Sequence, residues 1–364
     1  MIIGEIIQHL EIFAPVYFQE GYDNAGLIVG DGSSECTGII TSLDATEAVI
    51  DEAISKKCNL VVAHHPIIFR GLKKLNGKNY VERTILKAIK NDIAIYAIHT
   101  NLDNVKKGVN KKIAEKIGLQ NLQMLQPKEN ILKKLITFVP LDKAEDLRKA
   151  LFSAGAGQLG NYSECSFNSE GTGTFKPEEG AEPFVGKIGE RHEEKEMKIE
   201  VIFPVYLEQK IIRAMIDAHP YEEVAYDIIS LGNYLSDVGS GLIGELDKPV
   251  DETDFLGRIK TAFHLKVIKH TGLSGKKVKK VALCGGAGSF LIPVALSNKA
   301  DVYITSDIKY HEFFDAETML LLDIGHYESE QFTIDLLYDI LREKFPNFAV
   351  RKTEVNTNPV NYFF

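Results

Sequence analysis

The stretch NLVVAHHPIIF (59–69) joins an apolar run of strand length to two adjacent histidines. Before it, TGIITSL (37–43) has the composition of a second strand, and ATEAVIDEAISKK (45–57) has the apolar spacing of a helix. After it, IAIYAI (93–98) indicates a third strand. These runs rich in Ile and Val do not alternate with polar residues, which is typical of strands covered on both faces. The first third of the chain therefore predicts βαβ units and a parallel sheet flanked by helices.

The last third of the chain repeats this alternation. Three apolar runs, each followed by a helical or loop stretch, have strand length: KKVALC (279–284), DVYIT (301–305) and LLLDIG (320–325). Because the two ends of the chain share one pattern, we expect them to form a single α/β domain with α/β/α layers, assembled from residues 1–125 and 246–364.

The middle of the chain has a different order. A strand, a helix and a strand precede a stretch rich in Gly and Pro (171–190), and the same three elements then recur: KLITFV, DKAEDLRKALFSA and SECSFNS before it, and KIEVIFPV, YLEQKIIRAMIDA and VAYDIISL after it. Two β-α-β halves indicate a ferredoxin-like α+β domain. We therefore expect residues 126–245 to form an inserted domain, with residues 171–190 as a structured loop.

Length and composition restrict the class of protein. A chain of 364 residues is long enough for two domains. It holds 42 Lys and Arg against 51 Asp and Glu and has no basic block, which argues against a general nucleic-acid binder. No apolar run approaches the roughly 20 residues of a membrane span, and the four cysteines form no C-x-x-C pair. We therefore expect a cytoplasmic protein in a reducing environment, without a membrane or nucleic-acid partner.

Metal-ligating side chains follow four of the predicted strands. Half of the ten histidines stand at or shortly after a strand end: His64, His65, His99, His311 and His326. Ligands of open α/β sheets bind beyond the carboxyl ends of the strands, so we expect these residues to meet at one sheet edge. Adjacent residues of an extended segment point to opposite sides, so His64 and His65 would each bind one of two neighbouring metal ions.

Two carboxylates have a spacing that fits the same site. His326 and Glu330 lie four residues apart, one turn of a helix, and Asp103 follows His99 by four residues. Imidazole and carboxylate ligands favour Zn, Mn or Fe ions over a thiolate site, without choosing among them. Alone, a pair of histidines is more often structural, and a Glu in a first helical turn is also a partner for the helix dipole. The convergence of residues more than 200 positions apart favours metal binding.

Three other motifs have ordinary structural interpretations beside functional ones. GGAGS (285–289) follows a strand, so its amides would serve a tight turn or cradle an anion. In the inserted domain, His219 with Glu222 and Glu223 would bind a cation, although a solvated helix-exit loop is the commoner use of such residues. DNAGL (23–27) indicates turn chemistry alone.

Seven short motifs are similar to those of the GTP cyclohydrolase 1 type 2 homologue family, also called Nif-three-like proteins: YDNAGL (22–27), AHHPIIF (63–69), HTNLD (99–103), HPYEEVAYD (219–227), CGGAGS (284–289), TSDIKYHE (305–312) and GHYESE (325–330). The resemblance spans nearly the whole chain and is to the long form of the family, which has a PII/CutA-like insert. Seven motifs in the right order are far more specific than any one of them.

The resemblance implies a dinuclear metal site. Its ligands would be the residues already found near the strand ends, with the Glu330 carboxylate as the bridge: His64, His65, Asp103, His326 and Glu330. It also implies that His99, Asp307 and His311 line the cleft as catalytic residues that orient ligands or move protons. By this resemblance we expect two divalent cations per chain, zinc before manganese or iron, and a homohexamer whose metal sites face an internal cavity.

Two functions from different classes are consistent with these features. The first is a metal-dependent hydrolase, cyclohydrolase-like or acting on a phosphoester, in which a hydroxide between two metals attacks a nucleotide or related small molecule and His311 or His99 acts as acid or base. Nothing in these residues selects guanine. The second is a non-catalytic, hexameric metal-binding regulatory or scaffold protein, in which the insert senses a small molecule or docks a partner. The insert itself favours the second, since hydrolysis does not obviously need it.

Overall fold

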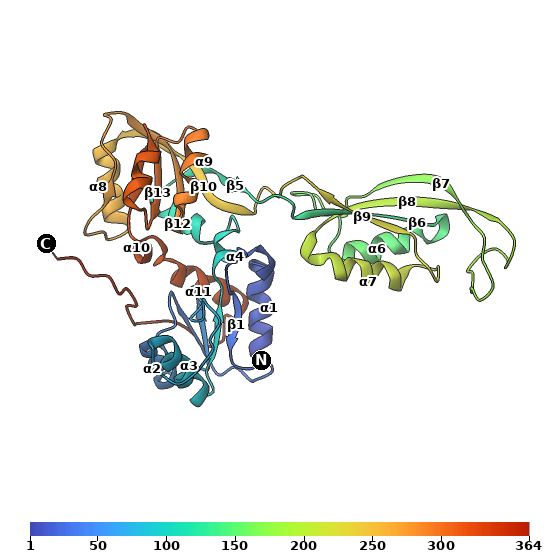
Figure 1. The fold of residues 1–364 in the computed structure, drawn as a ribbon, viewed down its shortest axis with the longest axis horizontal. Helices are drawn as coiled ribbons and strands as arrows, with labels where there is room; N and C mark the ends of the chain where they lie inside the picture. The colour runs from blue at the N-terminus through green and yellow to red at the C-terminus, as the bar shows by residue number, and fades with distance from the viewer. Residues whose placement is uncertain (364) are drawn as a thin grey trace. The chain divides into compact units, whose positions relative to one another are not determined.

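The computed structural model describes residues 1–363 and divides into two compact units. The first, the outer unit, contains Met1–Pro127 and the chain from Asp237 onward; the second, the insert unit, contains Lys128–Ser236 (Figure 1). The sequence predicted the insert at 126–245, whereas residues 237–245 lie in the outer unit. The reason is that β10 (Gly239–Asp251) begins there and is hydrogen-bonded between two strands of the outer unit.

One sheet of the outer unit has five strands in the order β1-β4-β3-β2-β15. Four of them are parallel, and β1 pairs antiparallel with β4 at one edge. Their bounds are β1 (Gly26–Val29), β2 (Ile39–Ser42), β3 (Leu60–Ala63), β4 (Ala94–Ala97) and β15 (Val350–Lys352). Every residue of β2, β3 and β4 is buried, as their unbroken apolar runs predicted.

Helices cover both faces of this sheet. On one face, α2 (Glu47–Ser55) and α3 (Tyr80–Lys90) bury their apolar residues against β2, β3 and β4. On the other, α11 (Thr333–Lys344) packs on β2 and β15, where the Thr41 hydroxyl donates to the Ile334 carbonyl, and α1 (Ile3–Phe13) packs against α11. Figure 1 shows these helices around the strands.

The other sheet of the outer unit has six strands in the order β11-β14-β13-β12-β10-β5. Its three central strands are parallel, and the others run antiparallel to their neighbours. The bounds are β5 (Gln120–Pro127), β10, β11 (Lys269–His270), β12 (Lys277–Ala287), β13 (Val302–Ser306) and β14 (Leu320–Asp323). The helices α5 (Val109–Ile117) and α8 (Glu252–Ala262) contact β10 and β12, and α9 (Ile292–Ser297) packs into a separate apolar cluster.

The outer unit therefore has two mixed sheets rather than the single parallel sheet that the sequence predicted. The chain leaves this unit along β5 and re-enters it along β10, so these neighbours must be antiparallel. The apolar runs identified the strands correctly, but covered parallel and antiparallel strands have similar sequences, and the runs did not assign them to sheets.

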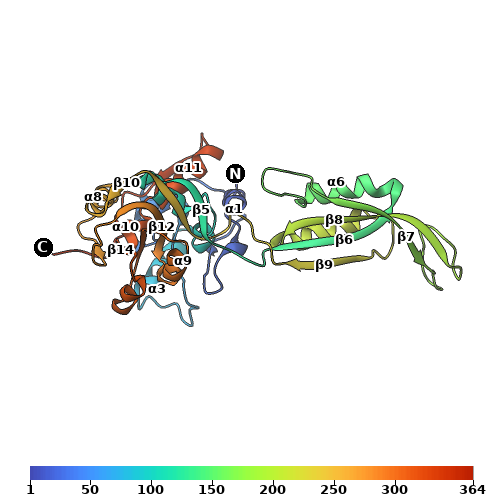
Figure 2. The ribbon, with the colours of Figure 1, turned by 90° about the horizontal axis from the view of Figure 1, so that it is seen from above.

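The insert unit has one four-stranded antiparallel sheet in the order β7-β8-β6-β9. Its elements follow the β-α-β-β-α-β order of ferredoxin-like domains: β6 (Leu132–Pro140), α6 (Ala144–Ala154), β7 (Phe167–Phe175), β8 (His192–Pro204), α7 (Glu208–Ala218) and β9 (Tyr226–Leu231). Both helices pack on one face of the sheet, where Val139, Ile199 and Val201 are buried (Figure 1). Figure 2 shows β8, β6 and β9 side by side in this order.

Strand β7 corrects the predicted loop at 171–190. It starts at Phe167 and continues to Phe175, so Gly171 and Gly173 lie in an edge strand rather than in a loop. The carboxylate of Glu196 on β8 explains one of these glycines: a Cβ at Gly173 would lie 2.1 Å from its Oε2 atom. A glycine inside a strand often marks such a close approach.

None of the helices in the described part of the chain has both the length and the apolar character needed to cross a bilayer. All four cysteines have free thiols.

Candidate metal centre

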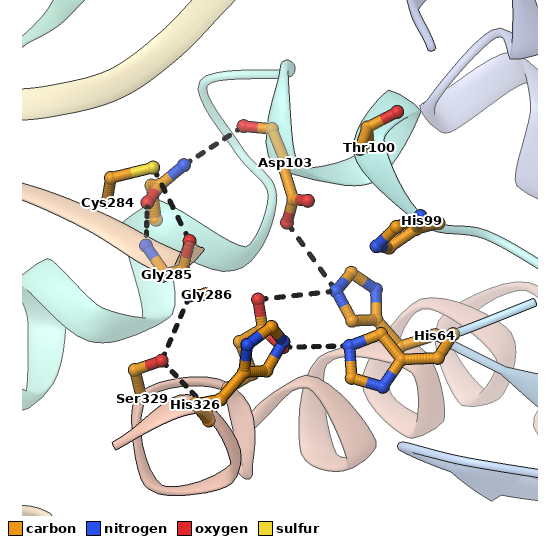
Figure 3. Close-up of polar contacts among 12 residues, drawn as sticks. His64, His99, Thr100, Asp103, Cys284, Gly285, Gly286, His326 and Ser329 are labelled. Carbon is orange, nitrogen blue, oxygen red and sulfur yellow. Dashed lines mark hydrogen bonds and ion pairs between the residues drawn. The ribbon is translucent and has the colours of Figure 1, made fainter. Parts of the chain in front are cut away.

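The predicted ligands meet where strands of both sheets of the outer unit end. His64 and His65 directly follow β3, and Asp103 ends the short helix α4 (Thr100–Asp103) that follows β4. From the other sheet, β14 leads through Gly325 into α10 (His326–Glu330). The prediction of a single sheet edge was wrong, because the ligands follow strands of two separate sheets. Figure 3 shows His64, Asp103 and His326 directed toward one another.

Three imidazoles are held in the same way, each through its Nδ1 atom. The Nδ1 of His64 donates to the Ile98 carbonyl at 2.8 Å. The Nδ1 of His65 lies 2.8 Å from Asp44 Oδ1, and that of His326 lies 2.7 Å from Asp307 Oδ2. Metal-binding histidines are commonly oriented by such a partner on the second ring nitrogen. The arrangement leaves all three Nε2 atoms directed at a common centre.

Glu330 lies at that centre, with its side chain only 3% exposed. Its Oε2 atom is 3.0 Å from the Nε2 of His65 and 3.2 Å from that of His326. Its Oε1 atom is on the side of His64, at 3.9 Å from Nε2. Two groups with possible ligand atoms within 4.8 Å of one another therefore share this carboxylate: His65, His326 and Glu330, and His64, Asp103 and Glu330.

The turn after β12 makes room for this carboxylate. Gly286 has a φ of +63°, and a Cβ on it would lie 2.3 Å from Glu330 Oε1. The amides of this turn are used within the protein: those of Gly285, Gly286 and Gly288 donate to Asn110, Ser329 and Thr305. Of the two uses considered for GGAGS, the tight turn fits and the anion cradle does not.

Two buried polar atoms at this centre lack a hydrogen-bond partner, and a cation at the centre could provide one. They are the Nε2 of His64 and the Oδ1 of Asp103, and they lie 3.6 Å apart. A buried polar atom left unsatisfied costs about 1–3 kcal/mol. Because His64 uses Nδ1–H as its donor, its Nε2 presents a lone pair, and a cation between the two atoms would satisfy both. The donor set therefore fits divalent metal ions.

The electrostatics of the centre are those of a carboxylate surrounded by imidazoles. Burial alone would raise the pKa of Glu330, but hydrogen bonds and charge from His326 and its neighbours hold that pKa well below its usual range. Burial would lower the pKa of His65 and of His326, yet contacts with Asp44, Asp307 and Glu330 raise them to about 10 and about 11. Without a metal, these two imidazoles therefore hold protons that a metal must displace.

The pKa of Asp103 is raised and that of His64 is lowered. Burial, with the nearby charge of Glu330, raises the pKa of Asp103 well above its usual range. Burial also lowers the pKa of His64, which keeps this imidazole neutral and able to act as a ligand. Burial thus disfavours the charged forms of both His64 and Asp103, and a cation bound between them would offset the cost of an ionised Asp103.

His99 lies beside the metal ligands, and its partner is a residue that sequence reasoning missed. The Nδ1 of His99 is 2.7 Å from Asp23 Oδ1, and Asp23 also accepts hydrogen bonds from the amide and hydroxyl of Thr100. These contacts outweigh the effect of burial and lower the pKa of Asp23 to about 2. Asp23 stood in a stretch that indicated only a turn, and the YDNAGL resemblance was the one signal that included it.

A third group of possible ligands comprises His64, His65 and His99, so the ring of His99 is close enough either to bind a cation or to exchange a proton beside one. Asp44 was also missed by sequence reasoning. It follows β2, where nothing in the local sequence distinguishes it from a loop aspartate, and only the fold brings it to His65.

The structure does not bring His311 into this group. It lies in the 3₁₀ segment Tyr310–Ala316, where its ring is exposed and contacts the ring of Tyr310 at 5.1 Å between centroids. Asp307 lies nearby in the chain with a φ of +55°, and its carboxylate anchors His326 rather than pointing freely into the cleft.

A cleft of about 400 Å³ opens beside the ligands. Tyr22, Phe69 and Phe290 line it with exposed rings, and Asn104, Asn110 and Ser240 add neutral polar groups. No Lys or Arg is among the described residues that line it. Besides its imidazoles, the cleft therefore offers flat apolar surfaces and carboxylates, and no Lys or Arg side chain for a phosphate.

In the insert unit, His219 has both ring nitrogens engaged. Nε2 donates to the Phe138 carbonyl at 2.8 Å, and Nδ1 accepts from the Tyr221 amide at 3.1 Å. His219, Glu222 and Glu223 are in none of the groups of possible metal ligands among the described residues. These residues therefore form no group of metal ligands within the described part of the chain, and they lie in the loop between α7 and β9.

The chain is similar to known proteins over its whole length. The family described as Duf34/NIF3 (NGG1p interacting factor 3) matches residues 1–359. Proteins named GTP cyclohydrolase 1 type 2 homolog from Halalkalibacterium halodurans and Bacillus subtilis are 40% and 39% identical over 363 and 364 residues, 98% of each chain. The crystal structure of a Bacillus cereus protein related to NIF3 matches with a TM-score of 0.86 and 40% identity, covering 100% of this chain and 99% of that one.

Proposed function

The chain belongs to the Duf34/NIF3 family, and on that premise we propose that it is a hydrolase with a dinuclear divalent-metal centre that acts on a nucleotide or a related compound. The observation that supports this most is the Glu330 carboxylate shared by two groups of ligands, one on each of its oxygens. A carboxylate with one oxygen directed at each group of ligands would help to hold two cations close together, as two-metal hydrolysis requires.

Each residue of the centre has a proposed role. His65, His326 and Glu330 would hold one cation, and His64, Asp103 and Glu330 the other, with zinc expected before manganese or iron. When bound, such a pair of cations polarises the bond attacked and lowers the pKa of a water molecule. Asp44 and Asp307 orient two of the imidazoles, which fixes the direction of their Nε2 lone pairs.

His99 is the proposed acid–base residue beside the cations. Asp23 is ionised and bound to its Nδ1, so it orients the ring and stabilises the imidazolium that forms when Nε2 takes a proton. For His311 we propose a role at the cleft of an adjoining subunit in the expected homohexamer, because its own chain leaves it exposed. Light scattering of the purified chain would measure the mass of that assembly.

The cleft supports a substrate recognised by its ring system. Tyr22, Phe69 and Phe290 offer faces on which a planar heterocycle can stack. The related proteins are named after GTP, but the lining holds no Lys or Arg for a triphosphate. We therefore expect the base rather than the phosphates to be what these side chains contact.

Elemental analysis of the purified, never-chelated chain tests the proposal, with a His64→Ala/Glu330→Ala variant beside it. We expect about two metal atoms per parent chain and almost none in the variant. The loaded chain is then incubated with a nucleobase, its nucleoside and its triphosphate, and ring opening is followed by absorbance. A parent that takes up no metal after reconstitution with zinc and manganese would rule out the mechanism.

The alternative is a metal-binding regulatory or scaffold protein with a PII/CutA-like insert. Two observations favour it: the β-α-β-β-α-β order of the insert unit and the cavity of about 680 Å³ that this unit contains. A biological effect that is lost when the insert unit is removed while metal binding survives, with turnover of every compound tested absent in the parent, would support this alternative over hydrolysis.

A further inference from the structure

The insert unit contains a cavity of its own, on the face of its sheet opposite α6 and α7. Met197, Ile199 and Val201 of β8 point toward the helices, so Glu196 and Lys198 point to the other face, where Gly171 and Ser169 of β7 lie opposite them. The loop of residues 176–191 closes this face with Pro177, Phe184 and neighbours. Figure 1 shows β7 and β8 extending beyond the two helices toward this loop. A volume of about 680 Å³ is within the range of small-molecule sites.

Two glycines hollow the floor of this cavity. Gly171 and Gly173 alternate with threonines along β7, so both present backbone alone to the cavity face. A Cβ on Gly171 would meet no atom within 4 Å, and one on Gly173 would collide with the Glu196 carboxylate. Glycines weaken a strand, and here they create the space that the cavity and its carboxylate occupy.

A buried carboxylate without a cationic partner stands in this hollow. Glu196 is 7% exposed, and its Oε1 accepts a hydrogen bond from the Tyr221 hydroxyl at 2.8 Å. No Lys, Arg or His nitrogen of the described residues forms an ion pair with it, because Lys198, the one cation of the lining, lies 2.6 Å from Glu200. Burying a charge is costly unless it is paired. The cavity thus contains a negative charge that a bound cation would compensate.

Two aromatic rings lie near the ring of Tyr221, whose hydroxyl group donates to this carboxylate. The ring of Tyr221 lies 6.1 Å from that of Phe175 and 6.2 Å from that of Phe184, between centroids. Glu170, Glu222 and Glu223 complete the lining and add further negative charge. Ring faces attract an organic cation through their quadrupole, and strongly hydrated metal ions gain less from such surfaces.

We propose that this cavity binds a small organic cation, an amine or quaternary ammonium compound, with its charged nitrogen between the rings of Phe175, Tyr221 and Phe184 and the carboxylate of Glu196. An anionic ligand is disfavoured, since four carboxylates line the cavity and its one lysine is already paired. The insert unit would then bind a ligand independently of the metal centre and of its proposed reaction.

Calorimetric titration of the full-length chain with choline chloride and with putrescine tests the proposal, in sodium chloride at matched ionic strength. We expect saturable binding of at least one of the two, with one equivalent per chain. Glu196→Gln keeps the acceptor for Tyr221 but removes the charge, so it should weaken this binding at least tenfold. Gly171→Leu should abolish it by filling the hollow.

Two control variants separate this site from other causes. Glu193→Gln removes the same charge from the same strand outside the cavity lining, and it should leave binding unchanged. His64→Ala should also leave it unchanged, which excludes an amine bound at the metal centre. Circular dichroism of each variant checks the fold, and the isosteric Glu196→Gln decides the matter if Gly171→Leu fails to fold.

Three results would overturn the proposal. The first is the absence of saturable binding by both compounds. The second is binding that Glu196→Gln does not weaken. The third is displacement of the bound compound by magnesium chloride at matched ionic strength, because this would assign the carboxylate to an inorganic cation. A change in the mass of the assembly in Glu196→Gln without any ligand binding would instead assign Glu196 to contact between copies of the chain.

Discussion

Glu330 in the outer unit and Glu196 in the insert unit are buried carboxylates that each line a cavity, and their surroundings differ. Glu330 is surrounded by the Nε2 atoms of three imidazoles, whereas Glu196 contacts a tyrosine hydroxyl near aromatic rings. Nitrogen lone pairs are ligands for a metal ion, and ring faces attract an organic cation. The same acidic group therefore indicates different ligands, and the neighbours of the charge decide which.

The sites at Glu330 and Glu196 also differ in how firmly their side chains are held. Each imidazole at Glu330 is anchored on its second nitrogen by a carbonyl or a carboxylate, from elements of two sheets. At Glu196 one hydrogen bond and packing against Gly173 hold the carboxylate, and part of the cavity wall is a loop. A metal requires fixed ligand geometry, while an organic cation tolerates variation in the positions of the rings around it.

The largest effect should come from Glu330→Gln, which removes the charge shared by both groups of ligands. We expect the metal content to fall from about two atoms per chain to nearly none, with turnover lost. Glu328→Gln, which removes the same charge two residues away on α10, is the control and should retain both metals. Elemental analysis of the two variants makes the comparison, and full metal content in Glu330→Gln would contradict a bridging role.

A second effect should appear as pH dependence of metal uptake. The pKa values of His65 and His326 are about 10 and about 11 without metal, so both rings are protonated at pH 7. Binding should release about two protons per chain from these rings, and affinity should rise with pH. Calorimetry in buffers of different ionisation enthalpy measures the number of protons. Metal affinity that does not change between pH 6 and 8 would contradict the raised pKa values of His65 and His326.

The same protons determine how the stability of the metal-free chain varies with pH. A folded pKa above the unfolded value stabilises the folded state fully below the unfolded value, near 6.5, and this stabilisation is lost as pH rises toward 10 and 11. The metal-free Tm should therefore fall over this window, while the gain in Tm from added metal should grow. Thermal denaturation with and without metal measures the metal-free Tm and the gain in Tm. A gain in Tm that shrinks with rising pH would contradict the raised pKa values of His65 and His326.

A smaller effect is expected from the residues that orient the ligands. Asp44→Asn keeps a side chain of similar shape at His65 Nδ1 but removes the charge, and it should weaken metal binding about 10- to 100-fold. Asp51→Asn, on the exposed side of α2, should have no measurable effect on affinity. Competition with a chelator gives the affinities, and equal values in the two variants would show that Asp44 does not orient a ligand.

The smallest effect tests whether the two sites are independent. Glu196→Gln should leave metal content and turnover within error of the parent, because the contacts described for its carboxylate lie within the insert unit. Glu330→Gln should likewise leave the affinity for choline or putrescine unchanged. A reproducible effect of either variant on the other site would mean that the two units are coupled.

Much of the fold could be predicted from local pattern. The runs NLVVA and IAIYAI became β3 and β4, and DVYIT became β13, since covered strands are apolar on both faces and such runs are conspicuous. Gly171 and Gly173, by contrast, led to the wrong prediction of a loop. Both lie in β7, and at Gly173 the reason for a glycine is the Glu196 carboxylate on the neighbouring strand, which no local pattern records.

The residues of the candidate site could also be predicted only in part. His64, His65, Asp103, His326 and Glu330 could be named because ligands tend to follow strand ends in α/β sheets. Asp23 and Asp44 could not be named on local grounds, since an aspartate in a loop is common and their partners are 76 and 21 residues away in the chain. His311 has the same kind of sequence context as His326, yet the structure places it on an exposed turn.

The sequence by itself determined which residues can bind a metal and which segments are strands, because residue type and the spacing of apolar side chains are local properties. The tertiary structure decided that the strands form two sheets, that their carboxyl ends meet around Glu330, and that Asp23, Asp44 and Asp307 each orient an imidazole. It also created the cavity around Glu196. Burial and distance between residues remote in the chain exist only after folding, and they convert separate side chains into sites.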